Sequence, residues 1–199
     1  MQENRNTESA ETKKKSVGRE LLEWVMCIAV ALVITLLLQN YVFRIVKVDG
    51  SSMEPTLKNG ERLVMLRLGY EPKAGDIVVV DVSDKPNLNR TGTNRPIRYI
   101  KRIIGMPGDT IRFEERDGKV VVLINGQPQE ESYIISDKYF NNVTLDKDYD
   151  VPEDHVFVMG DNRPGSADSR LKNVGYIHTD NVLGEAVFRI WPLDKIGTP

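Results

Sequence analysis

The sequence predicts a mainly β protein: a single N-terminal transmembrane helix followed by an extracytoplasmic, mostly antiparallel β domain that carries a smaller β-hairpin lobe. Three observations predict it. One apolar run of membrane length lies near the N-terminus, short β-branched stretches separated by Gly- and Pro-containing turns follow it, and no long amphipathic helical pattern appears after the run. At 199 residues the chain is long enough for one domain with a sizeable core and a smaller lobe.

Composition excludes several classes of protein. The net charge of −2, without a basic stripe, predicts no nucleic-acid partner. The single cysteine, Cys27, excludes an intramolecular disulfide and a thiolate metal cluster, and within an apolar run it is expected to be an inert thiol. Neither histidine, His155 or His178, stands near a serine or the cysteine as a triad would require. A serine nucleophile here therefore needs another base, and we expect neither a metal nor an organic cofactor.

An anchor follows a polar start. Residues 1–19 are poor in apolar side chains, and we expect a disordered tail. A helix over the apolar run Trp24–Phe43 would rise ~30 Å, the hydrocarbon thickness of a bilayer. We therefore assign residues 20–43 as a transmembrane anchor. The alternatives are a buried core helix, which the length and the lack of charges disfavour, and a cleaved secretory signal, which would need small residues at the end of the run.

Basic residues predict the orientation of the anchor. The run Lys13–Lys15 and Arg19 precede it, whereas Arg44 and Lys47 follow it. The positive-inside rule then keeps the N-terminus in the cytoplasm. The interpretation is a single-pass type II protein of the cell membrane, with residues 44–199 as an extracytoplasmic catalytic β domain.

Beyond the anchor the pattern becomes strand-like. Alternating or continuously apolar stretches predict strands at residues 45–48, 61–65, 76–80, 99–104, 119–124, 155–159 and 184–191. Asn125-Gly126 is a two-residue turn that tolerates positive φ and predicts a hairpin. We therefore assign residues 110–150 as an inserted hairpin lobe, with residues 136–150 irregular.

A polar turn, Gly50–Leu57, follows the first predicted strand and sets Ser52 three residues before a proline. Serine becomes a nucleophile only when a base removes its proton, and lysine is that base only when its pKa falls from ~10.4 toward neutrality. Burial lowers the pKa of a lysine. Lys101 meets this requirement within a strand, because it then shares a face with Tyr99 and Ile103. A lysine on a solvated strand is the alternative.

Three stretches, in this order behind one anchor, resemble bacterial type I signal peptidase. Ser52–Leu57 reads Ser-Met-Glu-Pro-Thr-Leu, the pattern that carries the nucleophile of that family. Lys101, followed by arginine, precedes a Gly-Met-Pro-Gly-Asp turn at 105–109, and Gly160–Arg170 reads Gly-Asp-Asn-Arg-Pro-Gly-Ser-Ala-Asp-Ser-Arg. The resemblance covers residues 18–193. It implies the Ser–Lys protease fold of signal peptidases and LexA-like proteins, and a membrane-bound serine endopeptidase that cleaves signal peptides from exported preproteins after an Ala-x-Ala-like site.

The resemblance also implies roles for single residues. Ser52 is the expected nucleophile and Lys101 the expected general base. Ser166 is expected to hydrogen-bond the lysine amine and orient it, as a third group does in a triad. Asp168 and Arg170 are expected to form an ion pair that holds their loop.

One position departs from part of the family. Gly50 stands where some relatives carry a serine that helps to bind the oxyanion, so a second donor must come from elsewhere. Water, a neighbouring amide and Ser51 are the alternatives. Nearby, Asp161 is expected to pair with Arg102.

Substrate binding is predicted from strand chemistry. An extended peptide pairs by its backbone with an exposed strand edge, and alternate side chains enter pockets. The apolar residues that we expect to line shallow pockets beside Ser52 are Val46, Val48, Met53, Leu57, Tyr99 and Ile100. The expected partners are the signal peptides of exported preproteins and the lipid bilayer.

Two other classes of protein are alternatives. One is a catalytically silent, membrane-anchored β module that binds exported partners; the presence of both Ser52 and Lys101 disfavours it. The other is a self-cleaving repressor with the same dyad, which would need a DNA-binding domain where this chain has a tail and an apolar run.

Overall fold

A computed structural model of the chain describes residues 17–85, 88, 96–134, 136 and 143–199. It divides into two compact units, residues 1–39 and 40–199, which are described separately below. Most of the tail expected at 1–19 lies outside the described residues.

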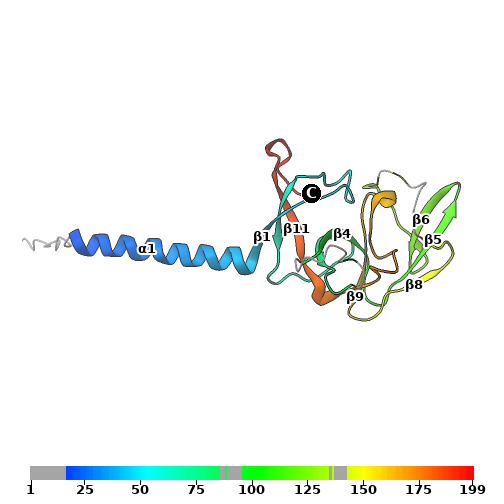
Figure 1. Cartoon of the computed structure of the whole chain (residues 1–199), viewed down its shortest axis with the longest axis horizontal. Helices are drawn as coiled ribbons and strands as arrows, with labels where there is room; N and C mark the ends of the chain where they lie inside the picture. Colours follow the sequence, from blue (N-terminus) through cyan, green and yellow to red (C-terminus); the bar gives the residue numbers. More distant parts are fainter. Residues whose placement is uncertain (1–16, 86–87, 89–95, 135, 137–142) are drawn as a thin grey trace, which may run out of the picture. The chain divides into compact units, whose positions relative to one another are not determined.

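The first unit contains the apolar helix α1, Val17–Leu37 (Figure 1). Within it, Gly18–Leu37 has a mean hydropathy of 2.2, so the helix is long and apolar enough to cross a membrane. One π-helical turn, Leu38–Val42, follows it. Phe43, assigned to the anchor from the sequence, is instead the first residue of a strand, because its backbone pairs with Leu66 of a neighbouring strand.

The second unit is built on an antiparallel sheet in the strand order β1-β2-β11-β3-β4-β9-β10. The strands are β1 Phe43–Lys47, β2 Arg62–Leu66, β3 Ile77–Asp81, β4 Arg98–Gly105, β9 His155–Met159, β10 Ile177–His178 and β11 Val182–Trp191. β3 lies near the middle of the sheet, where both faces are covered, which explains its uninterrupted apolar sequence. The short strand β10 is too brief to show a period and was not predicted.

A smaller antiparallel sheet has the order β7-β6-β5-β8. Its strands are β5 Thr110–Arg116, β6 Lys119–Ile124, β7 Gln127–Pro128 and β8 Asp148–Asp150. The turn between β6 and β7 is the predicted Asn-Gly pair, with φ of 52° at Asn125 and 77° at Gly126. The lobe predicted as a hairpin is thus a four-stranded sheet, and β8 lies in the stretch expected to be irregular. Strands of two or three residues carry no alternation that a pattern can reveal.

Three apolar clusters hold the second unit together. One packs between β3, β4, β9 and β10, around Val78, Ile103 and Val158. A second joins the larger sheet to the smaller one through Phe113 and Phe157. A third lies under the turn after β1. The buried members of the third cluster are Val48, Met53, Leu57, Leu63, Ile77 and Ala186. The larger sheet and this third cluster together position the site described below.

Gly184 allows β11 to pair with two strands in succession. The first residues of β11 pair with β3 and the later ones with β2, and the register shifts between Val182 and Gly184. Gly184 has a φ of +151°, and a Cβ at this position would collide with the carbonyl oxygen of Leu66. Only glycine fits this backbone without strain.

Gly184→Ala should therefore lower the free energy of unfolding by about 2–4 kcal/mol, through backbone strain and the steric overlap together. Gly118→Ala is the matched control, since Gly118 also has a positive φ (+73°) but has nothing within 4 Å of its added Cβ. Thermal unfolding of the full chain in detergent, followed by circular dichroism, measures both. Equal losses in the two variants would contradict this account of Gly184.

Candidate active site

The predicted turn after β1 presents Ser52 at the surface. The Leu57 N–H donates to the Met53 carbonyl at 2.9 Å, and both of these side chains are buried in the cluster beneath. Gly50 has a φ of +96°, and its N–H donates to Asn59 Oδ1 at 3.1 Å. Because its two apolar neighbours in the turn point into the core, Ser52 is left partly exposed at the top of the turn.

Lys101 reaches Ser52 from the middle of β4. The Lys101 amine donates to Ser52 Oγ at 2.7 Å and to the Ile100 carbonyl at 3.0 Å. Lys101 is 3% exposed, with its Nζ 5.1 Å from the centre of the Tyr99 ring. The fully buried Ile103 lies two residues along the same strand. The prediction that Lys101 is shielded from water is confirmed, with Tyr99 beside the amine, and the solvated alternative is wrong.

Burial lowers the pKa of Lys101 from 10.5 to about 8. Removing water from around an ammonium disfavours its charged form, and this is the largest influence. Two carboxylates act in the opposite sense, Asp168 more strongly than Asp161, while Arg170 lowers the pKa again. A fraction of the amine is therefore neutral near pH 7, as a general base requires.

The Asp168–Arg170 ion pair is part of this balance. Both side chains are buried, and Arg170 donates from Nε to Oδ1 and from Nη2 to Oδ2 of Asp168, each at 2.7 Å. Burial by itself raises the pKa of Asp168, but Arg170 and the Gly160 N–H outweigh it and hold that pKa below its usual range. The predicted pair is thus present. Because Arg170 carries a positive charge next to Asp168, the pair raises the pKa of Lys101 less than Asp168 alone would.

The loop after β9 holds the backbone of Ser52 by hydrogen bonds. The Asn162 N–H donates to the Ser52 carbonyl at 3.1 Å, and Asn162 Nδ2 donates to the Ser51 carbonyl at 3.1 Å. Gly160 allows the close approach, because a Cβ there would lie well inside 3.0 Å of both Ser166 Oγ and the Ser52 carbonyl oxygen. Sequence reasoning missed Asn162. Its contacts are with backbone atoms far away in the chain, which no local pattern encodes.

Ser166 lies in this site but not in the predicted hydrogen bond. A Cβ added to Gly160 would collide with both Ser166 Oγ and the Ser52 carbonyl oxygen, so these two atoms are neighbours. Within the described part of the chain, Ser166 Oγ is buried and makes no hydrogen bond of good geometry, although it helps to lower the pKa of the adjacent Asp168. The lysine amine instead donates to Ser52 and to its own strand.

Asp161 ties the turn to β4. Its carboxylate accepts from Arg102 Nε at 2.9 Å and from Arg102 Nη2 at 2.7 Å, as predicted. The same carboxylate accepts a hydrogen bond of 2.5 Å from Thr56 Oγ1. Since Arg102 follows Lys101 and Thr56 lies in the turn of Ser52, one buried carboxylate connects strand β4 to the turn that carries Ser52. Thr56 was not singled out from the sequence.

The residues predicted to line substrate pockets fall into two groups. Val48, Met53 and Leu57 are at most 3% exposed and belong to the core under the turn. Val46, Tyr99 and Ile100 are partly exposed around Ser52 and Lys101. The first group shapes the site from below, because anchoring the turn already uses its apolar surface.

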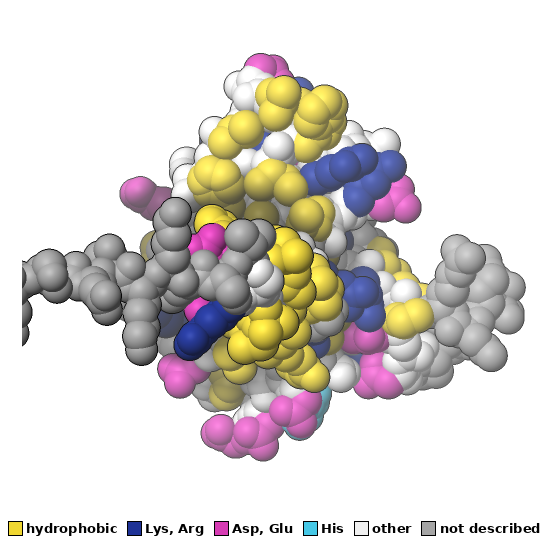
Figure 2. Space-filling view, turned by 90° about the vertical axis from the view of Figure 1, so that its left-hand side faces the viewer, with side chains coloured by type: hydrophobic (Ala, Val, Ile, Leu, Met, Phe, Trp, Pro, Cys, Tyr) yellow, Lys and Arg dark blue, Asp and Glu magenta, His cyan; other side chains and the backbone are white. Residues whose placement is uncertain are grey.

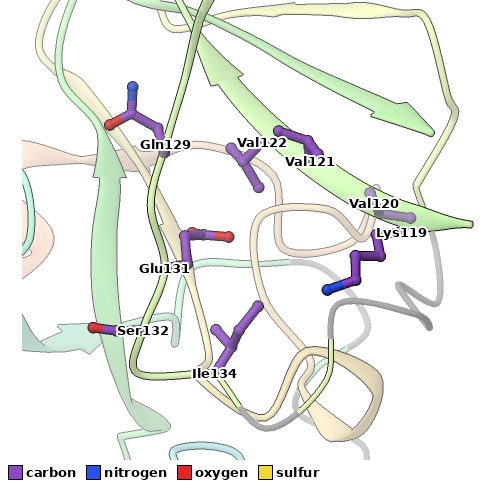
Figure 3. Close-up of a pocket in the computed structure, with 8 residues that line it drawn as sticks. All are labelled: Lys119, Val120, Val121, Val122, Gln129, Glu131, Ser132 and Ile134. Carbon is purple, nitrogen blue, oxygen red and sulfur yellow. The ribbon is translucent and has the colours of Figure 1, made fainter. Parts of the chain in front are cut away.

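Other candidate sites lie elsewhere. The cavity drawn in Figure 3, of about 300 Å³, is bounded by β6 and the segment after β7, without Ser52 or Lys101. His155 and His178 stack edge to face at 5.1 Å between ring centres, on paired strands. Among the residues that the structure describes, no three His, Cys, Asp or Glu side chains are grouped as a metal site.

Comparisons with known proteins give a consistent result. The family model described as signal peptidase, peptidase S26, matches residues 21–191. The chain is 37% identical over 199 residues to signal peptidase I of Bacillus licheniformis, with 96% of this chain and 97% of that protein covered. It is 35% identical over 205 residues to signal peptidase I T of Bacillus subtilis (strain 168), with 98% of each covered. A crystal structure of a signal peptidase I from Enterococcus faecalis V583 aligns with a TM-score of 0.41 and 31% identity, covering 58% of this chain and 97% of that one.

A buried lysine of lowered pKa predicts a pH-dependent stability. Between the folded pKa of about 8 and the ordinary 10.5, the unfolded chain binds more protons at Lys101 than the folded chain does, so stability rises with pH across this window. Below pH 8 the full cost of burying the ammonium is present. Lys101→Met should therefore be more stable than the wild type at pH 7 by on the order of 2 kcal/mol, and the difference should shrink between pH 8 and 10.

Urea or thermal unfolding of both full chains in detergent, at pH 7, 8, 9 and 10, measures this difference directly. Because the other titrating groups are shared, they cancel in the comparison. A constant difference over the whole range would mean that Lys101 has an ordinary pKa in the folded protein.

Proposed function

Because the chain belongs to the signal peptidase family, peptidase S26, and removes signal peptides from preproteins, we propose that it does so with Ser52 as nucleophile and Lys101 as general base. One observation carries the assignment of residues. The Ser52 hydroxyl and the buried Lys101 amine are 2.7 Å apart.

Acylation begins from the neutral amine. The contact of 2.7 Å allows the Ser52 hydroxyl to donate to Lys101 Nζ once the amine has lost its proton. As Ser52 Oγ bonds to the carbonyl carbon of the scissile peptide, its proton moves to Nζ. Lys101 then passes that proton to the leaving nitrogen as the C–N bond breaks. The product is an ester of Ser52 with the signal peptide, and the mature protein leaves with a new amino terminus.

Deacylation repeats the proton transfer with water. Neutral Lys101 takes a proton from the attacking water, the ester bond breaks, and Ser52 Oγ recovers the proton. Ser166 is the third member of the site in this proposal. Its buried hydroxyl lies beside Gly160, as the Ser52 carbonyl does, and its proposed role is to orient the amine of Lys101. Asp168 and Arg170 hold this side of the loop.

The Ser52 N–H is the proposed first donor to the oxyanion. Among the described residues it donates to no acceptor, whereas the N–H of Gly50 is already bound to Asn59. The clamp of Asn162 on the Ser52 carbonyl fixes the plane of the following peptide and so keeps the turn rigid. Preorganised donors of this kind contribute ~10²–10³ in rate. A water or a neighbouring amide supplies the second donor.

Substrate binding uses the edge of the larger sheet. β1 is the outermost strand, paired with β2 on one side only, so its other edge is free to pair with an extended peptide. The partly exposed Val46, Tyr99 and Ile100 surround the dyad with apolar surface. We propose that these three contact small residues of an Ala-x-Ala-like sequence, whereas Val48, Met53 and Leu57 form the floor beneath them.

The membrane is the proposed location of the reaction. α1 is the anchor, with its basic N-terminal flank in the cytoplasm and the catalytic unit outside, which makes the protein single-pass type II. Hydrophobic side chains also gather on the surface of the second unit, on its β1 and β11 side (Figure 2). The exposed ones are Phe43, Ile45, Phe188, Trp191, Leu193 and Ile196. An enzyme tethered in the bilayer meets a membrane-bound substrate at a raised effective concentration.

Ser52→Ala and Lys101→Ala should each lower cleavage of an Ala-x-Ala preprotein by at least ~10³-fold, because each removes a group that makes or breaks a bond. The assay follows processing by the full-length enzyme in detergent, and circular dichroism confirms the fold. Ser51→Ala is the matched control, since it removes the adjacent exposed hydroxyl and should retain activity. Full activity in Lys101→Ala would remove the proposed base, and inactive wild-type protein would favour a silent binding module.

The rate should rise with pH as Lys101 loses its proton. With a pKa of about 8, kcat/KM should increase roughly tenfold per pH unit below pH 7 and level off above pH 9. Rates of the wild-type enzyme between pH 5 and 10 measure this limb. A profile that is flat down to pH 5 would contradict a lysine base.

A further inference from the structure

One arginine ties the catalytic loop to a distant segment. Arg163 is 1% exposed and directly follows the residues that touch Ser52. Its guanidinium donates to the Glu131 carboxylate twice, from Nη1 to Oε2 at 2.7 Å and from Nη2 to Oε1 at 2.5 Å. Such a bidentate ion pair stabilises a buried guanidinium. Removing the carboxylate would leave the guanidinium buried with an uncompensated charge.

Arg163 also binds the backbone of the loop that precedes it. Its Nε donates to the Gly160 carbonyl at 3.2 Å. Gly160 is the residue packed against the Ser52 backbone, and Asn162 donates to the Ser52 carbonyl. The position of Ser52 therefore depends on the loop 160–162, and Arg163, which follows this loop, is held by Glu131.

The same segment reaches the other half of the dyad. Tyr133 donates from its hydroxyl to Glu131 Oε1 at 3.0 Å, and its ring covers the Arg102 guanidinium at 4.1 Å. Arg102 follows Lys101 in β4 and binds Asp161. Glu131 and Tyr133, which both follow β7, thus contact the two arginines that flank the site. Glu131 binds Arg163, next to Asn162, and Tyr133 covers Arg102, next to Lys101.

Cavities flank Glu131 on both sides. One of about 300 Å³ lies between β6 and residues 129–134, where Figure 3 shows Glu131 and Ile134 pointing toward the side of β6. Another, of about 230 Å³, lies toward β4 and also has Glu131 in its wall. Open space on both sides limits the apolar packing of this segment, so its ion pair and ring contacts fix its position.

We propose that Glu131 is a positioning residue for cleavage: it holds Arg163, and through Arg163 the loop 160–162, in the geometry that keeps Ser52 against Lys101. The proposal rests on the proposed Ser52–Lys101 dyad. It assigns to the segment between the two sheets a role in the rate of the reaction, beyond a role in holding the smaller sheet.

Glu131→Gln keeps the size of the side chain and removes its charge. In the full-length enzyme in detergent, kcat for an Ala-x-Ala preprotein should fall ten- to a hundredfold, because a misplacement of about 1 Å costs that much. KM should stay within about twofold, since Glu131 is not on the β1 edge. The acid limb of the pH profile should move to higher pH, because a relaxed loop admits water to Lys101, whose charged neighbours are Asp161, Asp168 and Arg170.

Two variants separate positioning from loss of stability. Glu131→Asp keeps a carboxylate for Arg163 and should recover most of kcat and the wild-type acid limb. Phe113→Leu removes packing from the core of the same lobe, where Phe113 is 0% exposed, and Phe113 lines neither of the two cavities beside Glu131. It should lower the unfolding temperature while leaving kcat and the acid limb unchanged.

If Glu131→Gln does not fold, Tyr133→Phe tests the same link more gently, because it removes only the hydroxyl that donates to Glu131 and keeps the ring over Arg102. A two- to fivefold loss of kcat is expected. The proposal is overturned if Glu131→Gln, or in its place Tyr133→Phe, matches the wild type, or if Phe113→Leu reproduces the change. In those cases Lys101→Ala would still be inactive, whereas an active Lys101→Ala would show that the dyad itself was wrong.

Discussion

The hydrogen bond between the buried amine of Lys101 and the hydroxyl of Ser52 is the interaction on which the rest of this structure depends. The strand β4 carries Lys101 at a position where Tyr99 covers it and Ile103 fixes the neighbouring side of the strand. Burying an ammonium is unfavourable, so the fold loses stability here in exchange for the lowered pKa that the proposed base requires. The apolar core around β3 and β4 makes that possible, because it holds the strand whether or not the amine is charged.

The surrounding ions serve the same end. Two buried carboxylates raise the pKa of Lys101, and each is paired with an arginine: Asp168 with Arg170 and Asp161 with Arg102. Arg170 acts in the opposite sense on that pKa. Asp161 also binds Thr56 in the nucleophile's turn, so the pair that shields the base also positions the serine. The ion pairs of the site are therefore a means of excluding net charge while keeping the loops fixed.

Much of this could be predicted from the sequence, and the reason lies in what local patterns encode. Uninterrupted apolar residues marked β3, and alternation placed Lys101 on the same face as Tyr99 and Ile103. Family resemblance then selected Ser52 out of many serines. Local sequence patterns did not predict the long-range contacts. Asn162 binds backbone carbonyls of the turn after β1, and Arg163 binds Glu131, which lies 32 residues earlier in the chain. The very short strands β7, β8 and β10 were missed because they exist only through pairing.

The predicted hydrogen bond from Ser166 to the lysine shows a related limit. Its neighbourhood was identified, but the partner of a rotatable hydroxyl depends on the charge of the amine, which a motif does not specify. The proposed mechanism depends on the charge of this amine. The most direct measurement is a titration of Lys101 itself, by NMR of the lysine side chains in the full-length enzyme in detergent, with Lys101→Arg to assign the signal. The account predicts a midpoint near 8, and a midpoint at the ordinary 10.5 would contradict it.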